Sequence, residues 1–285
     1  MEIKTPAKIN LYLDITGKRP DGYHELISLM CCIGIRDTVR FSFDQPDTAG
    51  NLTVACDHPD VPSGRDNLAF GAAEAFLKEA DITPDKLFIS IKKQIPVGAG
   101  LGGGSSNAAA VLCGLNRYYG NPVSPERLTE IAAGIGADIP FFIFGSPAAA
   151  EGIGEKLTPV EGLTDMPLVV IYPGRPLPTG SVYKKFNLAL TNPEKINKKI
   201  IFEPGWVAGI SRHLFNALEP AAIKLCPEIG EAKQILLEYG AEGALMSGSG
   251  SSVFGIFKDM HGAENAYAKL SGRSRWRVFL TQLLA

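Results

Sequence analysis

The sequence has no excess of charge of either sign: 28 lysine and arginine residues stand against 30 aspartate and glutamate residues. A chain with a formal net charge of −2 lacks the basic surplus with which proteins bind nucleic-acid phosphates. It also lacks an apolar run near the roughly 18 residues that span a bilayer, because Asp138 interrupts the best candidate, 135–144. We therefore expect a small-molecule substrate as partner, with no nucleic acid and no membrane.

Cysteine and histidine are too scattered for a disulfide framework or a metal site. The five cysteines include no C-x-x-C pair, and the four histidines match no metal-ligand spacing. The first residues lack the basic start and apolar stretch of a signal peptide. These absences favour reduced thiols in a soluble, cytoplasmic protein.

What remains is an ordinary globular composition over 285 residues, of which 45% are hydrophobic. This length predicts two domains, or one large one, at roughly 150 residues a domain. The composition changes after about residue 150, where Gly152, Gly154, Pro159 and Gly162 punctuate the chain. We place a domain boundary between 150 and 158.

Apolar residues alternate strictly from Ala7 to Ile15, which predicts a strand with one buried face. Similar patterns predict strands over 39–43, 52–56, 87–91, 168–172, 253–257 and 278–281. They predict helices over 68–80, 105–119, 125 to 134 or 136, 140–144, 216–225, 229–239 and 263–270. Helices and strands mix without regular βαβ alternation, so the predicted fold class is α+β.

A glycine-rich loop between a predicted strand and a predicted helix is the strongest chemical signal. Its bare backbone amides, together with the amides at the helix start, can converge on one anion. A flexible linker is the competing interpretation, but its position between strand and helix favours a phosphate site. The candidate ATP-binding residues of the loop are Pro96, Val97, Gly98, Ala99, Gly100, Leu101, Gly102, Gly103, Gly104, Ser105 and Ser106.

Two common phosphate loops fit poorly here. The spacing Gly98-x-Gly100-x-x-Gly103 matches the dinucleotide fingerprint, but the acidic residue expected about 20 positions on falls at Glu126, inside a predicted helix. The Walker loop fails because Gly104 stands where its lysine should be. The loop therefore has no cation of its own.

Lys8 is the natural source of that missing charge. It shares the polar face of the first strand with Asn10, two residues away, so both side chains point the same way. A solvated lysine on a half-exposed strand is the alternative interpretation.

Asp138 is the one charged residue in the apolar and glycine-rich segment 131–150. A carboxylate in such surroundings must be hydrogen-bonded or ion-paired. It could cap the helix that follows, or it could orient or deprotonate a substrate hydroxyl, as phosphoryl transfer requires.

A second glycine-serine loop follows at 247–252. It is either a tight connection between a helix and a strand or a wall that closes over phosphate or substrate.

The first strand, the loop PVGAGLGGGSSNAAA and the segments GIGADIPFF and MSGSGSSVFG together resemble the GHMP kinase superfamily along the whole chain. Within it, PAKINL at 6–11 and GKRPDGYHEL at 17–26 resemble the branch that phosphorylates 4-diphosphocytidyl-2-C-methyl-D-erythritol in the non-mevalonate isoprenoid pathway. The resemblance implies a two-domain α+β kinase with its active site in the cleft between domains. Residues 1–154 would form the ATP-binding domain and 155–285 the substrate or lid domain.

The same resemblance implies roles for individual residues. Asp138 would take the proton from the C2 hydroxyl, while Lys8 would keep Asp138 ionised and stabilise charge near the transferred phosphate. Asn67 would lie near the nucleotide, and Asn10 near the substrate. Tyr23 and a second aromatic, Tyr183, would enclose the cytosine ring, and His24 would read its polar edge. ATP would be accompanied by Mg²⁺, with Ser106 a candidate contact and the other magnesium ligands unassigned.

Two other functions remain open. A kinase of the same superfamily acting on homoserine or mevalonate would have no use for the aromatic pair Tyr23-His24. A catalytically silent nucleotide-binding regulator on the same fold would not need Lys8 and Asp138, which are both present.

Overall fold

The computed structural model describes residues 1–43, 51–84, 86–163, 165–186, 204–207, 209–272 and 275–284. The chain forms two compact units that interleave along the sequence. Unit 1 contains Met1–Ala7, Ile35–Val97 and Gly102–Gly145, and unit 2 contains Lys8–Gly34, Gly98–Leu101 and Ser146–Ala285. That residues 1–154 form an ATP-binding domain and 155–285 a substrate or lid domain stays a prediction.

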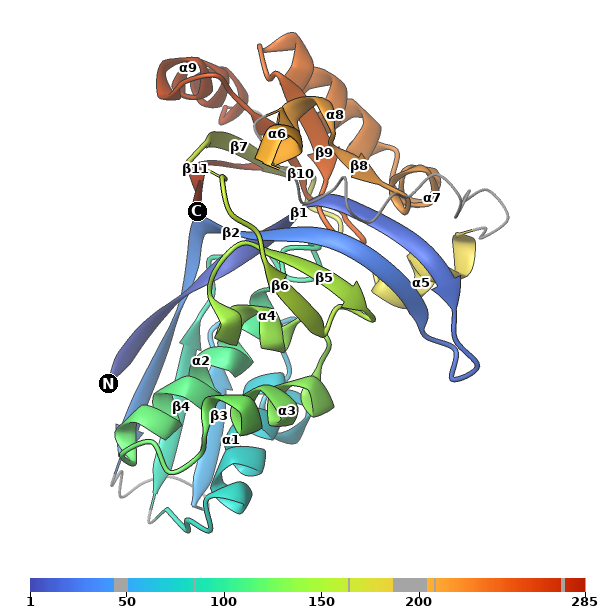
Figure 1. Ribbon diagram of the computed structural model, residues 1–285. Helices are drawn as coiled ribbons and strands as arrows, with labels where there is room; N and C mark the ends of the chain where they lie inside the picture. Colours follow the sequence, from blue (N-terminus) through green and yellow to red (C-terminus); the bar gives the residue numbers. More distant parts are fainter. Residues whose placement is uncertain are drawn as a thin grey trace. The chain divides into compact units, whose positions relative to one another are not determined.

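Two long strands, β1 (Glu2–Lys18) and β2 (His24–Phe43), contribute to both units. In unit 1, β2 pairs antiparallel with β4 (Leu87–Lys92), and β4 pairs parallel with β3 (Leu52–Cys56). Four helices lie beside these strands (Figure 1). They are α1 (Leu68–Glu79), α2 (Gly103–Tyr118), α3 (Pro125–Ile135) and α4 (Ile139–Phe144).

Local sequence explains where the helices of unit 1 begin. The Asn67 side chain accepts a hydrogen bond from the Ala69 amide at 2.9 Å and caps α1. Ser124 caps α3 in the same way, with Pro125 as the first helical residue. The apolar sides of α1 and α2 meet β2 and β4 in one core, whose largest fully buried member is Phe76.

Unit 2 is built on the antiparallel strands β11 (Arg277–Leu284), β7 (Pro167–Tyr172), β10 (Val253–Ile256) and β9 (Gly243–Met246), in that order. The first half of β2 pairs with β5 (Ala148–Gly152), which pairs with β6 (Lys156–Pro159). β1 pairs parallel with the short β8 (Phe215–Asn216).

The helices of unit 2 are α5 (Thr179–Lys185), α6 (Pro204–Val207), α7 (Glu219–Leu225), α8 (Glu228–Glu238) and α9 (Met260–Leu270). Figure 1 shows α8 and α9 beside the strands β7, β9 and β10. Their apolar residues join a second core, centred on Ile171, Met246 and Leu236. The mixed helices and strands confirm the α+β prediction.

Two sequence predictions need correction, and two strands were missed. The helix expected from Asn216 begins at Glu219, because the Asn216 side chain accepts a hydrogen bond from the Leu218 amide and belongs to β8. The strand expected from Val39 extends back to His24. Its first half was missed because residues 26–35 are apolar on both faces and show no alternation. The strands β5 and β6 were not predicted.

Candidate active site

The glycine loop has the geometry that its composition predicts. Gly98, Gly100 and Gly102 have positive φ angles of 63°, 76° and 68°, which residues with a side chain rarely adopt. Gly102 is the N-cap of α2, so the unpaired amides of this helix begin directly after the loop. The arrangement suits an anion such as a phosphate.

Ser106 lies in the first turns of α2 and is 1% exposed. Its hydroxyl oxygen is buried and has no hydrogen-bond partner among the residues that the structure describes. A buried hydroxyl without a partner is uncommon, because desolvating it costs free energy. Ser106 therefore has a free donor and acceptor at the helix start.

The middle of the loop, Gly98–Leu101, belongs to unit 2 and is fixed there by its own carbonyl groups. The Ser247 hydroxyl donates to the Gly100 oxygen at 2.9 Å, and the Ser252 amide donates to the Ala99 oxygen at 3.0 Å. The Lys8 amide donates to the Leu101 oxygen at 3.0 Å. The first strand and the second glycine-serine loop thus hold three consecutive residues of this segment, Ala99, Gly100 and Leu101.

The second loop, 247–252, connects β9 to β10, so the expectation that it joins a helix to a strand was wrong. The Asn216 side chain donates to the carbonyl oxygens of Met246 and Gly248, each at 2.8 Å. A Cβ on Gly100 would lie 2.2 Å from the Ser247 oxygen, which leaves no room for a side chain. The close approach of the two loops requires glycine.

Lys8 and Asn10 are buried, at 4% and 3% exposure, so the alternative of a solvated lysine was wrong. The Lys8 ammonium donates to Asn10 Oδ1 at 2.7 Å, and Asn10 Nδ2 donates to Ser28 Oγ at 2.8 Å. A Cβ on Gly248 would lie 3.4 Å from both Lys8 Nζ and Asn10 Oδ1, and 3.0 Å from the Gly100 oxygen. The structure therefore brings the Lys8 ammonium to the glycine loop.

Asp138 lies in unit 1, at the residue before α4, and is half-buried. Asp138 occupies the N-cap position of α4, as the capping interpretation predicts, but its side chain makes no capping hydrogen bond to the helix. Because Lys8 belongs to unit 2, the pairing of Lys8 with Asp138 stays a prediction.

His24 contacts two aromatic rings in unit 2. Its ring centroid lies 4.9 Å from that of Tyr183 and 6.4 Å from that of Phe186, which the sequence analysis did not select. Partial burial, together with the charge of Lys18, lowers the pKa of His24. This shift favours the neutral imidazole, which can both donate and accept. Tyr23 is 61% exposed.

Asn67 is engaged on both sides of its amide. Besides capping α1, its Nδ2 donates to the Pro62 oxygen at 2.9 Å. This geometry fixes Asn67 in the fold, and its predicted contact with nucleotide stays a prediction.

No group of three or more histidine, cysteine, aspartate or glutamate residues suited to a metal occurs in the described ranges. No described helix is long and apolar enough to cross a membrane. The cytoplasmic location stays a prediction.

Sequence reasoning missed a buried polar network in unit 1 that includes Asp37, Lys93 and Asn107. These residues are 56 and 14 positions apart along the chain, so no local pattern joins them.

Comparison with known proteins identifies the family. Residues 67–146 match the model of the GHMP kinases N terminal domain, and residues 207–274 match that of the GHMP kinases C terminal domain. The chain is 43% identical to a 4-diphosphocytidyl-2-C-methyl-D-erythritol kinase of Geobacter sp. (strain M21), covering 97% of this chain and 96% of the relative. It is 46% identical to the enzyme of that name from Syntrophotalea carbinolica, with the same coverage.

Solved structures agree with this assignment. A crystal structure of 4-(cytidine 5'-diphospho)-2C-methyl-D-erythritol kinase matches with a TM-score of 0.82 and 36% identity over all of both chains. Homoserine kinase from Cytophaga hutchinsonii shares the fold, with a TM-score of 0.77 and 19% identity over 100% of this chain and 95% of that one. The chain therefore belongs to the GHMP kinase family and is a small-molecule kinase.

Proposed function

We propose that this protein transfers the γ-phosphate of ATP to the 2-hydroxyl of 4-diphosphocytidyl-2-C-methyl-D-erythritol. The names of relatives that cover 97% of the chain support the substrate. The observation that carries the proposal is the buried Lys8 ammonium beside Gly248, in the second loop, which hydrogen-bonds to the glycine loop through Ser247. A fixed positive charge at a bare amide loop is what a transferring phosphoryl group needs.

In the proposed reaction Asp138 is the general base. It accepts the proton of the C2 hydroxyl as the hydroxyl oxygen forms a bond to the γ-phosphorus, and the bond from that phosphorus to the bridging β–γ oxygen breaks. ADP carries away the electron pair of that bond. Lys8, positioned by Asn10, stabilises the negative charge on the transferring group.

The loop residues 96–106 bind the phosphates of ATP in this proposal, through backbone amides at Gly98–Leu101 and at the start of α2. Asn67, which begins α1, lies on the nucleotide side. We assign residues 1–154 mainly to ATP binding and 155–285 mainly to the substrate, with Asn10, Tyr23 and His24 of the first part also on the substrate.

Mg²⁺ fits this chain as a companion of ATP rather than as a resident metal. The unpartnered Ser106 hydroxyl is a suitable oxygen ligand, and phosphate oxygens and water would fill the other positions. When bound, the ion neutralises charge on the phosphates.

Tyr23, His24 and Tyr183 of unit 2 form the proposed cytidine site. Cytosine would stack on Tyr183 and Tyr23, while the neutral His24 ring would hydrogen-bond to its polar edge. Tyr23 is exposed and so is accessible to a ligand.

The test is a substrate panel with Mg·ATP, in which ADP release is measured with the cytidine-linked substrate, mevalonate and homoserine. We expect turnover of the first alone. Asp138→Asn should lower kcat by about 10²–10⁴-fold, the range for removing a general base. Lys8→Met should lower kcat comparably with folding retained, as judged by circular dichroism.

Arg127→Gln is the control, because Arg127 is exposed and pairs with the exposed residues Glu79 and Glu130. Turnover of mevalonate or homoserine in place of the cytidine-linked substrate would overturn the substrate. Nucleotide binding without turnover, unchanged by Asp138→Asn, would identify a silent regulator instead.

A further inference from the structure

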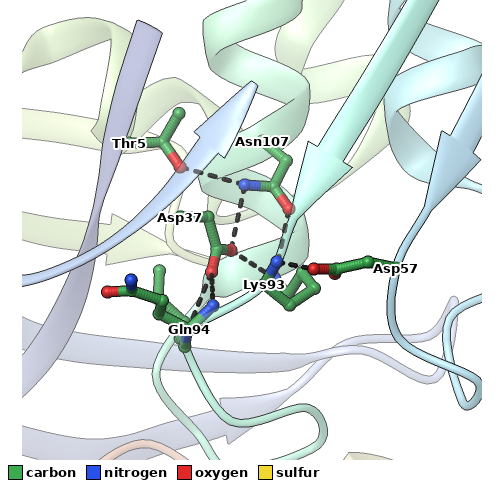
Figure 2. A network of polar contacts seen from close by, with 7 residues as sticks. Thr5, Asp37, Asp57, Lys93, Gln94 and Asn107 are labelled. Atoms are coloured by element: carbon green, nitrogen blue, oxygen red, sulfur yellow. Dashed lines mark hydrogen bonds and ion pairs between the residues drawn. The ribbon is translucent and has the colours of Figure 1, made fainter. Parts of the chain in front are cut away.

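Asp37 of β2 is a completely buried carboxylate at the centre of the polar network in unit 1. Figure 2 shows Lys93 and Gln94, which directly follow β4, and Asn107 of α2 converging on it. A buried carboxylate is costly unless each oxygen is hydrogen-bonded, so its partners identify what this one holds in place.

One oxygen of Asp37 binds the backbone just before the glycine loop. Asp37 Oδ1 accepts hydrogen bonds from the Gln94 amide at 2.7 Å and from the Ile95 amide at 2.8 Å. These two residues follow β4 and directly precede Pro96. The carboxylate therefore fixes the direction in which the chain enters the loop.

The other oxygen binds the helix that leaves the loop. Asp37 Oδ2 accepts from Asn107 Nδ2 at 3.0 Å and from the ammonium of Lys93. Asn107 lies in the first turns of α2, and its Nδ2 also donates to Thr5 Oγ1 at 2.9 Å. Both ends of the glycine loop are thus tied to one side chain.

The two ends also meet directly at Gly103, the first residue of α2. A Cβ there would lie 3.0 Å from both Ile95 Cγ2 and Lys93 Nζ. The side chains of the entering segment therefore pack against the helix start, and the Asp37 hydrogen bonds fix the separation between that segment and α2.

Lys93 would be the obvious cation for a phosphate so near the loop, but its ammonium is used inside the protein. Its side chain is 5% exposed, and its Nζ donates to Asp37 and, at 3.1 Å, to Asn107 Oδ1. Its charge compensates the buried carboxylate. A buried ion pair adds little stability compared with packed apolar residues, which argues for a purpose other than stability.

We propose that Asp37 is a positioning residue for ATP: through its two oxygens it sets the spacing between the entering backbone and the α2 N-terminus, whose amides receive the phosphates. The proposal rests on the proposed function only for the use of ATP by this loop. It does not depend on the identity of the acceptor.

The first test is Asp37→Asn. Asparagine keeps one acceptor for the Gln94 and Ile95 amides but turns an NH₂ group toward two donors. We expect KM for ATP to rise about tenfold or more, because small misplacements of a binding group are costly. KM for the acceptor should not change. Faster hydrogen exchange at the Gln94 and Ile95 amides should accompany the loss.

Leu115→Ala is the matched control. Leu115 is fully buried in the core of unit 1 and lies on α2, as Asn107 does. It lies near the other end of α2, far along the helix from the loop. This substitution should lower the melting temperature and leave KM for ATP unchanged. If Asp37→Asn behaves like Leu115→Ala, with lower stability and normal KM values below the transition, the positioning role is wrong.

Two further variants keep the proposal testable if Asp37→Asn does not fold. Asn107→Ala leaves the Asp37–Lys93 pair and the Gln94 and Ile95 bonds in place but cuts the link to α2, so ATP affinity should fall. Asp37→Asn with Lys93→Met removes the unpaired ammonium and frees Asn107 Oδ1 to accept from the introduced amide, so that the link to α2 is restored. ATP affinity should then recover to within about threefold of the original. If Lys93 instead bound phosphate, the double variant would bind ATP as weakly as Asp37→Asn alone, or more weakly.

Calorimetric titration with Mg·ATP alone separates this proposal from the proposed function. A protein that binds ATP but fails to phosphorylate the cytidine-linked substrate would contradict the proposed function, while the Asp37 variants could still be compared. Unchanged ATP affinity in Asn107→Ala and in folded Asp37→Asn would contradict the positioning role alone.

Discussion

The glycine loop begins and ends in unit 1, where buried charged groups hold it, whereas its middle lies in unit 2, where neutral groups hold it. In unit 1 the Asp37 carboxylate receives two backbone amides and the side chains of Lys93 and Asn107. In unit 2 the loop carbonyls accept from the Ser247 hydroxyl and from backbone amides.

The two arrangements are sensitive to different changes. Replacing a charge in the unit 1 network leaves its partner buried and uncompensated, which is costly even when the volume is kept. In unit 2 the backbones of the two loops approach so closely that added volume is the larger threat. Substitutions that separate volume from charge therefore test the comparison.

Gly100→Ala should have the largest effect. Its Cβ would lie 2.2 Å from the Ser247 oxygen and 3.0 Å from the backbone of Gly250, and its φ of 76° already disfavours alanine. Because both contacts are with backbone atoms, the two loops must separate. We expect kcat/KM for ATP to fall about 10²-fold and the melting temperature to drop.

Gly104→Ala is the counterpart in unit 1, measured by thermal unfolding. Its Cβ would lie 3.5 Å from Leu68 Cδ1, an ordinary contact, and alanine is favoured over glycine within a helix by about 1 kcal/mol. The melting temperature should stay level or rise. A Gly100→Ala protein as stable as Gly104→Ala would show that the close approach of the loops is unimportant.

Ser247→Ala should have an intermediate effect, because it removes one neutral hydrogen bond without adding volume. The Gly100 oxygen would lose its donor, at a cost of about 1 kcal/mol. Ser252→Ala is the control, since the buried Ser252 hydroxyl has no hydrogen-bond partner within the described part of the chain. Thermal unfolding should therefore show a larger loss for Ser247→Ala than for Ser252→Ala; equal losses would assign the effect to packing.

Much of this fold could be predicted because its signals are local. The alternation of 7–15 lies within β1, and β3 has the predicted bounds. Asn67, directly before the predicted helix, caps α1. The glycine loop was likewise visible as a run of bare amides before a helix. Each of these features is decided by residues within one turn or one strand of each other.

The remaining features depend on contacts between distant segments. Alternation correctly separates the two faces of β1, but it cannot show that Lys8 and Asn10 are buried as well, because the second loop packs near them. Asp37 looks like an ordinary polar residue in a strand until Lys93 and Asn107 are placed beside it. The short alanine strand β5 has too weak a pattern to be recognised alone.

Two buried carboxylates provide the finest comparison between the units. Asp37 receives four donors, one of them an ammonium. Asp14 of β1, in unit 2, is 7% exposed and accepts from the Ile15 amide at 2.7 Å and from the Tyr12 hydroxyl at 3.5 Å. Burial raises the pKa of Asp14, despite these two contacts.

This shift gives the sign of the last prediction. A raised pKa means that the folded protein holds the proton more tightly than the unfolded chain, so ionisation of Asp14 disfavours folding as the pH rises through that pKa. Asp14→Asn keeps an acceptor for the Ile15 amide and removes the charge. It should raise the melting temperature at pH 7, and the gain should shrink as the pH falls through the raised pKa of Asp14, where the folded carboxyl takes up its proton. Asp37→Asn should lower the melting temperature at pH 7, because there the charge is compensated. If both variants shift the melting temperature in the same direction at pH 7, burial alone would set the free-energy cost of each carboxylate. The four donors around Asp37 would then make no difference between Asp37 and Asp14.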